Sequence, residues 1–98
     1  MVIKKLPLEK DIEAKFVREA KKLGCLCRKL NGMGARDWPD RLVLVPGGAI
    51  LLIEFKRLGA TLRPSQEAWH EDAKAIGQEP YVFDNWEQPL ALVERKLR

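Results

Sequence analysis

The chain of 98 residues has few of the side chains that bind zinc or form disulfide bridges. His70 is its only histidine, and its two cysteines, Cys25 and Cys27, are separated by a single residue. Both thiols would point to the same face of a strand, so a bridge between them would be strained. Because neither a CxxC pair nor paired histidines are present, we expect no zinc site. We interpret both cysteines as reduced, half-buried strand residues.

Long hydrophobic runs are also missing. The longest, from Ala49 to Ile53, is far too short to cross a bilayer, and the first residues lack the apolar core of a signal peptide. We therefore expect a soluble, cytoplasmic protein without a membrane partner. A hydrophobic content of 46% in a chain of this length suits one compact core, which predicts a single domain over residues 1–98. The net charge of +4, spread along the chain, favours a polyanionic partner.

Periodic patterns predict three helices and four strands. Apolar residues recur with helical spacing in residues 8–23, 64–76 and 86–97. Residues 25–30, 42–45, 49–55 and 80–83 are typical of strands, and the Pro-Gly-Gly between the second and third is typical of a hairpin turn. This order, α-β-β-β-α-β-α, predicts an α/β fold with a mixed central sheet. Because both hairpin strands are apolar on both faces, we expect helices on each side of the sheet.

The hairpin is expected to place two carboxylates opposite each other. If its loop is Pro-Gly-Gly alone, Val45 pairs with Ala49, and counting outward places Asp40 directly opposite Glu54. Lys56 lies two residues beyond Glu54 and therefore projects from the same face. Opposed carboxylates repel each other, and a bound cation would remove that penalty. A loop of two or four residues would instead move Asp40 away from Glu54.

Glu54 interrupts an otherwise apolar strand, although acidic residues are depleted in strands. Such a local violation often marks a functional position. Mg²⁺ is usually held by one or two carboxylates together with waters and phosphate oxygens, which this pair could supply. Lys56 would then stabilise charge that develops near the attacking water or the scissile phosphate. The alternative is a salt bridge between Lys56 and either acid at the edge of the sheet.

The same residues carry a resemblance to a known family. Trp38-Pro39-Asp40-Arg41, followed by Glu54-Phe55-Lys56, is similar to the PD-(D/E)XK signature of the restriction-endonuclease-like superfamily. The segment from Arg36 to His70, with its PGG turn, EFKR and Ser65-Gln66, closely resembles the VRR-NUC family, whose small stand-alone members occur in phages and bacteria. The resemblance covers nearly the whole chain. It implies one restriction-endonuclease-like domain, in the cytoplasm of a bacterium or of a phage-infected host cell.

The resemblance implies a nuclease site that uses Mg²⁺ or Mn²⁺. Four residues match the family motif: Asp40 and Glu54 as metal-binding acids, Lys56 as the catalytic lysine, and Gln66 as the glutamine after the EXK strand. The family also has an acid on its first helix. Glu13 is the favoured candidate for this catalytic, metal-binding acid, and Glu9 is the alternative. Either glutamate could instead be a solvated helix charge.

The implied substrate is DNA, with structure-selective cutting of branched forms such as four-way (Holliday) junctions. Basic residues flank the proposed site and are candidate phosphate contacts, or else ordinary surface charges: Lys29, Arg36, Arg41, Arg57 and Arg63. Trp38 and Trp69 could stack on unpaired bases, although buried packing is the favoured interpretation of both.

The resemblance further implies a homodimer that makes paired cuts. Apolar residues of the last predicted helix could form its interface or complete the core: Trp86, Leu90, Val93 and Leu97. The alternatives to junction resolution are a flap-directed or nick-directed nuclease, a non-catalytic DNA-binding module on the same fold, and a salt-bridged scaffold protein. Opposed carboxylates argue against a pure binding module, because they would repel phosphate.

Overall fold

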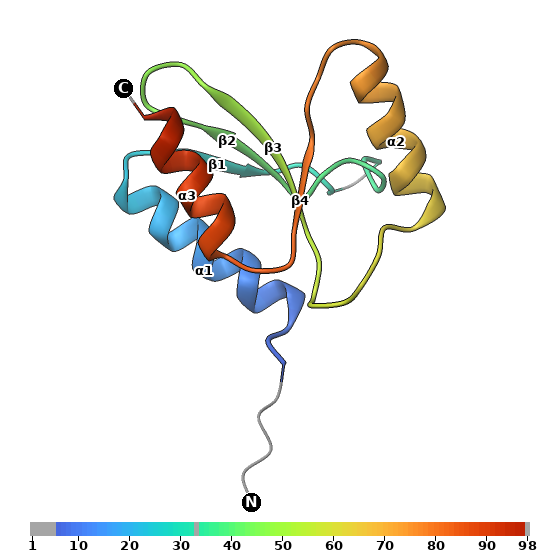
Figure 1. The fold of residues 1–98 in the computed structure, drawn as a ribbon, viewed down its shortest axis with the longest axis horizontal. Helices are drawn as coiled ribbons and strands as arrows, with labels where there is room; N and C mark the ends of the chain where they lie inside the picture. The colour runs from blue at the N-terminus through green and yellow to red at the C-terminus, as the bar shows by residue number, and fades with distance from the viewer. Residues whose placement is uncertain (1–5, 33, 98) are drawn as a thin grey trace, which may run out of the picture.

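The computed structural model describes residues 6–32 and 34–97 (Figure 1). Its elements are α1 (Glu9–Lys22), β1 (Leu26–Lys29), β2 (Arg41–Leu44), β3 (Ile50–Phe55), α2 (Pro64–Ala75), β4 (Tyr81–Phe83) and α3 (Glu87–Lys96). The order and type of all seven elements are confirmed, and their ends differ from the expected ones by no more than one residue. No helix in the described part of the chain is long and apolar enough to cross a membrane.

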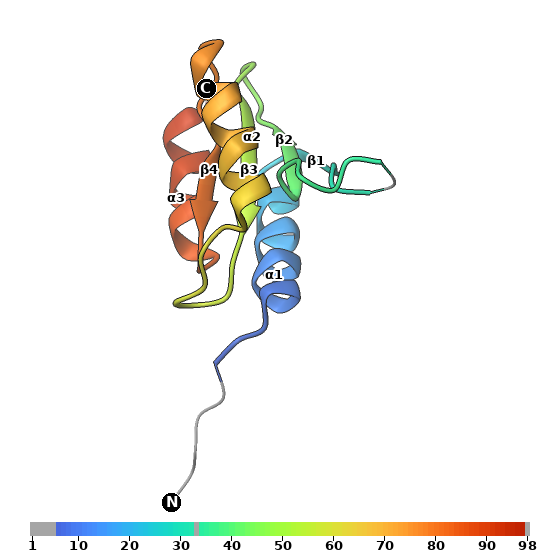
Figure 2. The ribbon, with the colours of Figure 1, turned by 90° about the vertical axis from the view of Figure 1, so that its right-hand side faces the viewer.

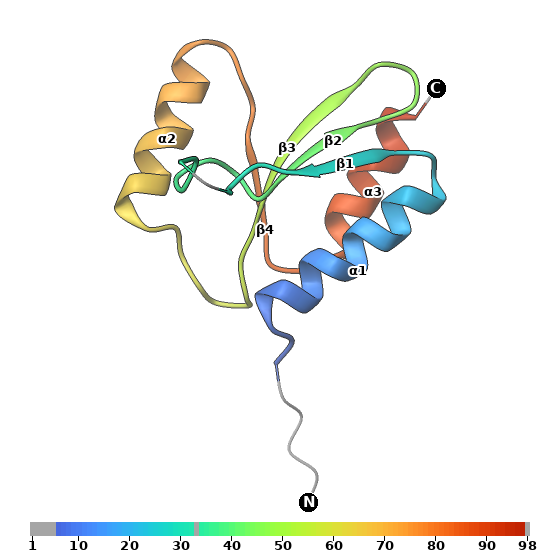
Figure 3. The same cartoon turned by 180° about the vertical axis from the view of Figure 1, so that it is seen from behind.

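The four strands form one mixed sheet in the order β1-β2-β3-β4. The pairs β1–β2 and β2–β3 are antiparallel, whereas β3 and β4 are parallel. A parallel pair needs a crossover connection, and α2 provides it. α1 and α3 lie on one side of the sheet and α2 on the other (Figures 1 and 3). The strand order makes β1 and β4 the two edge strands.

The hydrophobic core fills the space between the sheet and the helix pair α1 and α3. Phe16 of α1, Ile53 and Phe55 of β3, and Val93 of α3 are fully buried in it. The rings of Phe16 and Phe55 lie 5.4 Å apart between centroids and are tilted by 47°, a geometry that aromatic pairs favour. Burial of one such side chain contributes roughly 1.5–3 kcal/mol, so these residues hold both helices on the sheet.

The opposite face of the sheet, which we call the open face, is only partly covered. Leu26, Leu44 and Ile50 point to this face, with 69%, 39% and 63% of their surfaces exposed. The register pairs Leu26 with Leu44 and Leu44 with Ile50, so they form one apolar strip across three strands. Helices lie on both sides of the sheet, as expected, but α2 leaves this strip uncovered. α2 is the helix on the open face, and it contacts β3 through a hydrogen bond from Gln66 to Glu54.

The end of α1 depends on a glycine. Gly24 has a φ of +92°, and its amide donates to a carbonyl in the last turn of the helix. A Cβ added at this position would lie 3.2 Å from Cγ of Pro46 in the hairpin turn. Residues other than glycine adopt such a left-handed conformation at an energy penalty of roughly 1–2 kcal/mol.

We therefore expect Gly24→Ala to lower the free energy of unfolding by about 1–2 kcal/mol, as measured by urea denaturation. Gly32→Ala is the matched control, because Gly32 has no positive φ and no atom lies within 4 Å of the added Cβ. Equal destabilisation by both substitutions would contradict this account of Gly24.

Candidate active site

The β2–β3 hairpin aligns the two carboxylates as predicted. Its register pairs Arg41 with Ile53, which is the pairing that a three-residue turn requires. Asp40 and Glu54 are the next residues outward, so they lie level with each other at the end of the ladder. Both are buried, with 4% and 1% of their surfaces exposed. Two acidic side chains are thus withdrawn from water side by side.

Asp40 is held by donors on both of its carboxylate oxygens. The side-chain amide of Asn31 donates to Oδ1, and the backbone amide of Phe55 donates to Oδ2 over 2.7 Å. Asn31 lies in the loop between β1 and β2, which projects from the body of the molecule (Figure 2). This residue was not singled out from the sequence, because it lies outside the family motif, next to the first predicted strand. Asn31 fixes the orientation of the Asp40 carboxylate.

Glu54 is less well satisfied than Asp40. Its Oε2 accepts a long hydrogen bond of 3.4 Å from the side-chain amide of Gln66. Its Oε1 is buried and has no hydrogen-bond partner among the described residues. Burial, and then the neighbouring charge of Asp40, raise the pKa of Glu54 from 4.5 to about 8. A buried acceptor beside a second carboxylate is a poor arrangement for an isolated protein and a good one for a cation.

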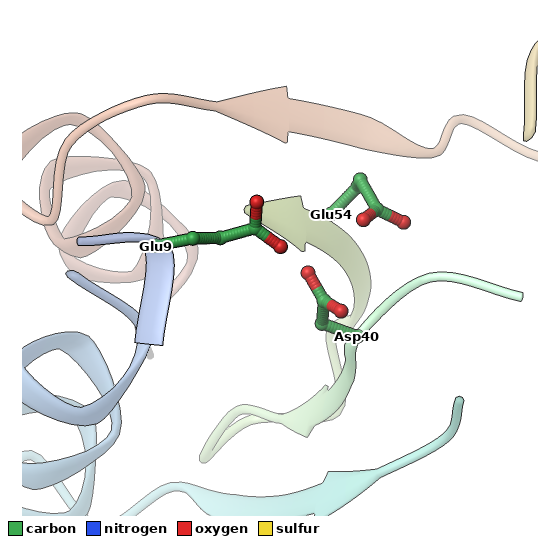
Figure 4. A group of neighbouring side chains, drawn as sticks. All are labelled: Glu9, Asp40 and Glu54. Carbon is green, nitrogen blue, oxygen red and sulfur yellow. The ribbon is translucent and has the colours of Figure 1, made fainter. Parts of the chain in front are cut away.

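A third carboxylate completes the cluster, and it belongs to Glu9. Glu9, Asp40 and Glu54 each offer an oxygen, and these three atoms lie within 4.8 Å of one another (Figure 4). Partial burial is the main cause that raises the pKa of Glu9, and Asp40 raises it further. We call these three residues the carboxylate cluster.

Glu13, the favoured acid on the first helix, has a different partner. Its Oε2 accepts from Nε of Arg41 at 2.6 Å, in a half-buried ion pair between α1 and β2. The structure therefore brings the alternative, Glu9, to the other two acids, and it does not bring Glu13 there. Glu9 is one helical turn closer to the start of α1, which reaches the end of the β2–β3 hairpin where Asp40 and Glu54 lie.

Lys56 lies two residues beyond Glu54, directly after the end of β3. Only 7% of its surface is exposed, and its backbone amide donates to the carbonyl of Phe83 in β4 over 2.9 Å. No carboxylate in the described part of the chain lies within ion-pair distance of its ammonium group, so the predicted alternative of a salt bridge is not found there. Its positive charge nevertheless offsets part of the rise in the pKa of both Glu9 and Glu54. Lys56 is thus a buried cation close to the carboxylate cluster.

Gln66 points toward the sheet, as its helix face predicted. Its Oε1 accepts from the backbone amide of Arg63 over 2.9 Å, which caps the start of α2. This bond turns Nε2 of the same side chain toward Glu54. One residue therefore ties the start of α2 to the carboxylate cluster.

Comparisons with known proteins agree with this geometry. A solved structure described as "VRR_NUC domain" has a TM-score of 0.76 and 30% identity, covering 88% of this chain and 94% of that one. "Putative nuclease p44" of Acyrthosiphon pisum secondary endosymbiont phage 1 is 36% identical over 77 residues, which are 79% of this chain and 83% of the phage protein. The chain belongs to the VRR-NUC nuclease family. No family sequence model matches it.

The basic residues of this VRR-NUC chain fall into two groups. Lys29, Arg36, Arg57 and Arg63 are exposed, as phosphate contacts must be. Arg41 is half-buried, and its guanidinium group is engaged by Glu13. This ion pair joins β2 to α1, and the contact of Arg41 with phosphate stays a prediction.

The carboxylate cluster of the VRR-NUC fold suits a hard divalent cation. All three donors are carboxylates, which Mg²⁺ and Mn²⁺ prefer over the nitrogen and sulfur ligands of zinc sites. The unpartnered Oε1 of Glu54 is an acceptor that a cation would satisfy. The residues present therefore fit such an ion.

Proposed function

We propose that this VRR-NUC protein is a divalent-cation-dependent endonuclease that hydrolyses phosphodiester bonds in DNA. The observation that carries the proposal is the convergence of Glu9, Asp40 and Glu54 around an unpartnered buried oxygen, with Lys56 just beyond the end of β3. A structural salt bridge would leave no buried acceptor without a partner, and a binding module would gain nothing from acids that repel phosphate.

Asp40, Glu54 and Glu9 are the residues that would hold Mg²⁺ or Mn²⁺. When bound, such an ion supplies Lewis acidity to a phosphoryl oxygen and offsets the charge of the cluster. The protein's own contribution is orientation. Asn31 and the Phe55 amide hold Asp40, and Gln66 holds one oxygen of Glu54, so the acids are preorganised before DNA arrives.

Lys56 is the residue proposed to act on the reacting atoms. In hydrolysis, a water oxygen bonds to phosphorus, one phosphorus–oxygen ester bond breaks, and the leaving oxygen takes a proton. Negative charge grows on the phosphoryl oxygens along this path. The Lys56 ammonium group donates hydrogen bonds and carries no acceptor, so it stabilises that charge and orients the water. Its burial strengthens the effect, because the surrounding dielectric constant is low.

The direct test is cleavage of linear duplex, nicked, flap and four-way junction DNA with Mg²⁺, with Mn²⁺ and with a chelator. Cleavage with either cation and none with the chelator is the expected result. DNA binding without cleavage in every condition would support the non-catalytic module instead. Weak DNA binding that Mg²⁺ does not change would support a scaffold protein.

The acid on α1 can be identified by substitution. We expect Glu9→Gln to weaken Mg²⁺ binding at least about tenfold, because it removes one charged ligand of the cluster. Glu13→Gln is the matched control on the same helix, since Glu13 is paired with Arg41. Mg²⁺ titrations followed by thermal melting give both affinities. A larger loss from Glu13→Gln than from Glu9→Gln would restore Glu13 as the metal-binding acid.

We propose branched DNA, and four-way junctions in particular, as the preferred substrate of a homodimer. One chain carries one carboxylate cluster among its described residues. A twofold dimer would present two clusters to the two strands of a substrate with matching symmetry. Three of the four candidate residues of the last helix serve the core, because Val93 is buried and Trp86 and Leu97 pack against it, and Leu90 is half-buried. The exposed strip of Leu26, Leu44 and Ile50 on the open face is the apolar surface we propose instead.

Light scattering at micromolar concentration should give about twice the 11.2 kDa monomer mass. Ile50→Lys should return the protein to the monomer, because it places a charge in the strip. Ile76→Lys is the matched control, since Ile76 is more exposed and follows α2. Cuts on a junction labelled on each strand should fall at equivalent positions on opposing arms. A strictly monomeric protein that still cuts junctions efficiently, or that prefers flaps, would overturn the dimer proposal.

A further inference from the structure

A hollow of about 510 Å³ lies beside the carboxylate cluster. Its walls include Trp38, Leu52, Trp69 and Ile76, and the exposed Asp72 and Gln78 add polar groups. We call it the tryptophan hollow. Its volume lies in the range of small-molecule sites, which are mostly apolar with a few polar groups that orient the ligand.

The same elements build the hollow and the carboxylate cluster. Leu52 precedes Glu54 by two residues on β3, so both side chains project from the open face, roughly 6.6 Å apart along the strand. On α2, Trp69 follows Gln66 by three residues, and Gln66 donates to Glu54. Three residues span roughly 4.5 Å along a helix axis. The hollow is therefore adjacent to the cluster along both the strand and the helix.

Trp38 is unusually exposed for a residue so close to the proposed site. It precedes Asp40 by two residues, and 47% of its surface is accessible, against the buried packing that its sequence context favoured. Its ring contacts that of Trp69, with centroids 5.0 Å apart and planes at 52°. Trp69 thus packs against Trp38, while much of the Trp38 ring remains available to a ligand. The exposed Arg36, two residues earlier, adds positive charge for a neighbouring phosphate.

We infer that the tryptophan hollow takes an unpaired DNA base, stacked on Trp38, from the strand whose phosphate lies at the carboxylate cluster. The inference rests on the proposed nuclease function and extends it to the choice of substrate. Inside a duplex, both faces of a base are covered by its neighbours, so only an unstacked base can contact an indole ring. Asp72 and Gln78, which also line the hollow, offer hydrogen-bond partners to the polar edge of such a base.

The consequence concerns where the enzyme cuts. A base at a branch point or in a single-stranded extension needs less free energy to leave its stack than a base in a continuous duplex. The hollow would therefore favour cleavage within one or two nucleotides of such a base. Selection by an unpaired base needs no reading of sequence, because every base has an aromatic face.

The test uses a duplex with a single-stranded extension, in which an abasic nucleotide replaces each position near the branch in turn. Affinity is measured by fluorescence anisotropy with Glu54→Gln protein, so that the DNA is not cut. At one position the abasic nucleotide should weaken binding by roughly 5- to 150-fold. Trp38→Leu should bind the intact DNA about as weakly and should show no further loss at that position. Trp38→Phe, which keeps an aromatic face, should retain most of the difference.

Several outcomes separate this inference from the proposed function. Equal affinity for intact and abasic DNA at every position would overturn the tryptophan hollow as a base site. The same abasic effect in Trp38→Leu as in the parent would also overturn it, provided that thermal melting shows the variant to be folded. Base dependence in a wild-type protein that cuts no DNA with Mg²⁺ or Mn²⁺ would refute the nuclease and support the base site. No measurable binding of either DNA would refute both.

Discussion

Glu54→Gln should reduce DNA cleavage by at least about 10²–10³-fold while leaving DNA affinity nearly unchanged. The substitution keeps the size of the side chain and its contact with Gln66, but removes the charge at the buried, unpartnered Oε1. A neutral amide is a poor ligand for a hard divalent cation, so the active arrangement would be lost. DNA affinity should not fall, because a carboxylate near phosphate contributes repulsion and not attraction.

The measurement is single-turnover cleavage with saturating Mg²⁺, together with a separate binding titration. Asp40→Asn and Lys56→Ala should behave in the same way, since they remove another ligand and the buried ammonium group. Glu67→Gln is the matched control, because Glu67 is an exposed glutamate in the first turn of α2. Cleavage by Glu54→Gln or Asp40→Asn within a fewfold of the wild type would remove these residues from the site.

The second large effect is on stability without metal. The pKa of Glu54 is raised from 4.5 to about 8, so folding favours its protonated form. The stabilisation from that form is complete below about pH 4.5 and is lost as the pH rises through about 8. Glu9 contributes in the same direction, because its pKa is also raised. At about pH 8.5, Glu54→Gln should therefore be more stable than the wild type by on the order of 2–4 kcal/mol.

Urea denaturation of both proteins in chelator, from about pH 5 to about pH 8.5, measures this difference. The wild type and the variant must be compared because His70 also makes stability depend on pH. Burial lowers the pKa of His70, so protonation of His70 destabilises the fold as the pH falls. That contribution is common to both proteins and cancels. Added Mg²⁺ should reverse the order at high pH, stabilising the wild type and not the variant. If the difference in stability between the wild type and Glu54→Gln does not change with pH, the surroundings of Glu54 do not raise its pKa.

Asp40→Asn is expected to behave differently in the absence of metal, although repulsion from Glu54 acts on both acids. Both oxygens of Asp40 accept hydrogen bonds, from Asn31 and from the amide of Phe55. An asparagine would turn its NH₂ group toward one of these donors and leave it unpaired. Relief of repulsion and loss of a hydrogen bond would then oppose each other. Glu54→Gln is the sharper probe because its Oε1 has no partner to lose.

The hairpin shows which parts of the fold are readable from the chain alone. The register of β2 and β3 follows from local features, namely the Pro-Gly-Gly turn and the alternation of buried side chains around it. Once Arg41 is paired with Ile53, the alignment of Asp40 and Glu54 follows by counting. Local chemistry therefore predicted two of the three acids of the carboxylate cluster before any tertiary contact was known.

The choice between Glu9 and Glu13 could not be made in that way. The axial position of α1 on the sheet is set by packing between remote residues, of which the contact of Phe16 with Phe55 is one. A shift of one helical turn, about 5.4 Å, would exchange the two glutamates. The role of Asn31 has the same origin, because it depends on the path of a long loop through space. Coverage of the open face depends likewise on how far one crossover helix extends.

The edges of the sheet also bear on how two copies can meet. Strand addition at an edge requires a row of free amides and carbonyls, and β1 and β4 offer only 4 and 3 residues. β1 also carries the exposed Arg28 and Lys29, and charged side chains on an edge strand discourage its pairing with another chain. A sheet that continues from one subunit into the next is therefore disfavoured, and the proposed face-to-face packing would leave the basic β1 edge of each copy free to approach DNA.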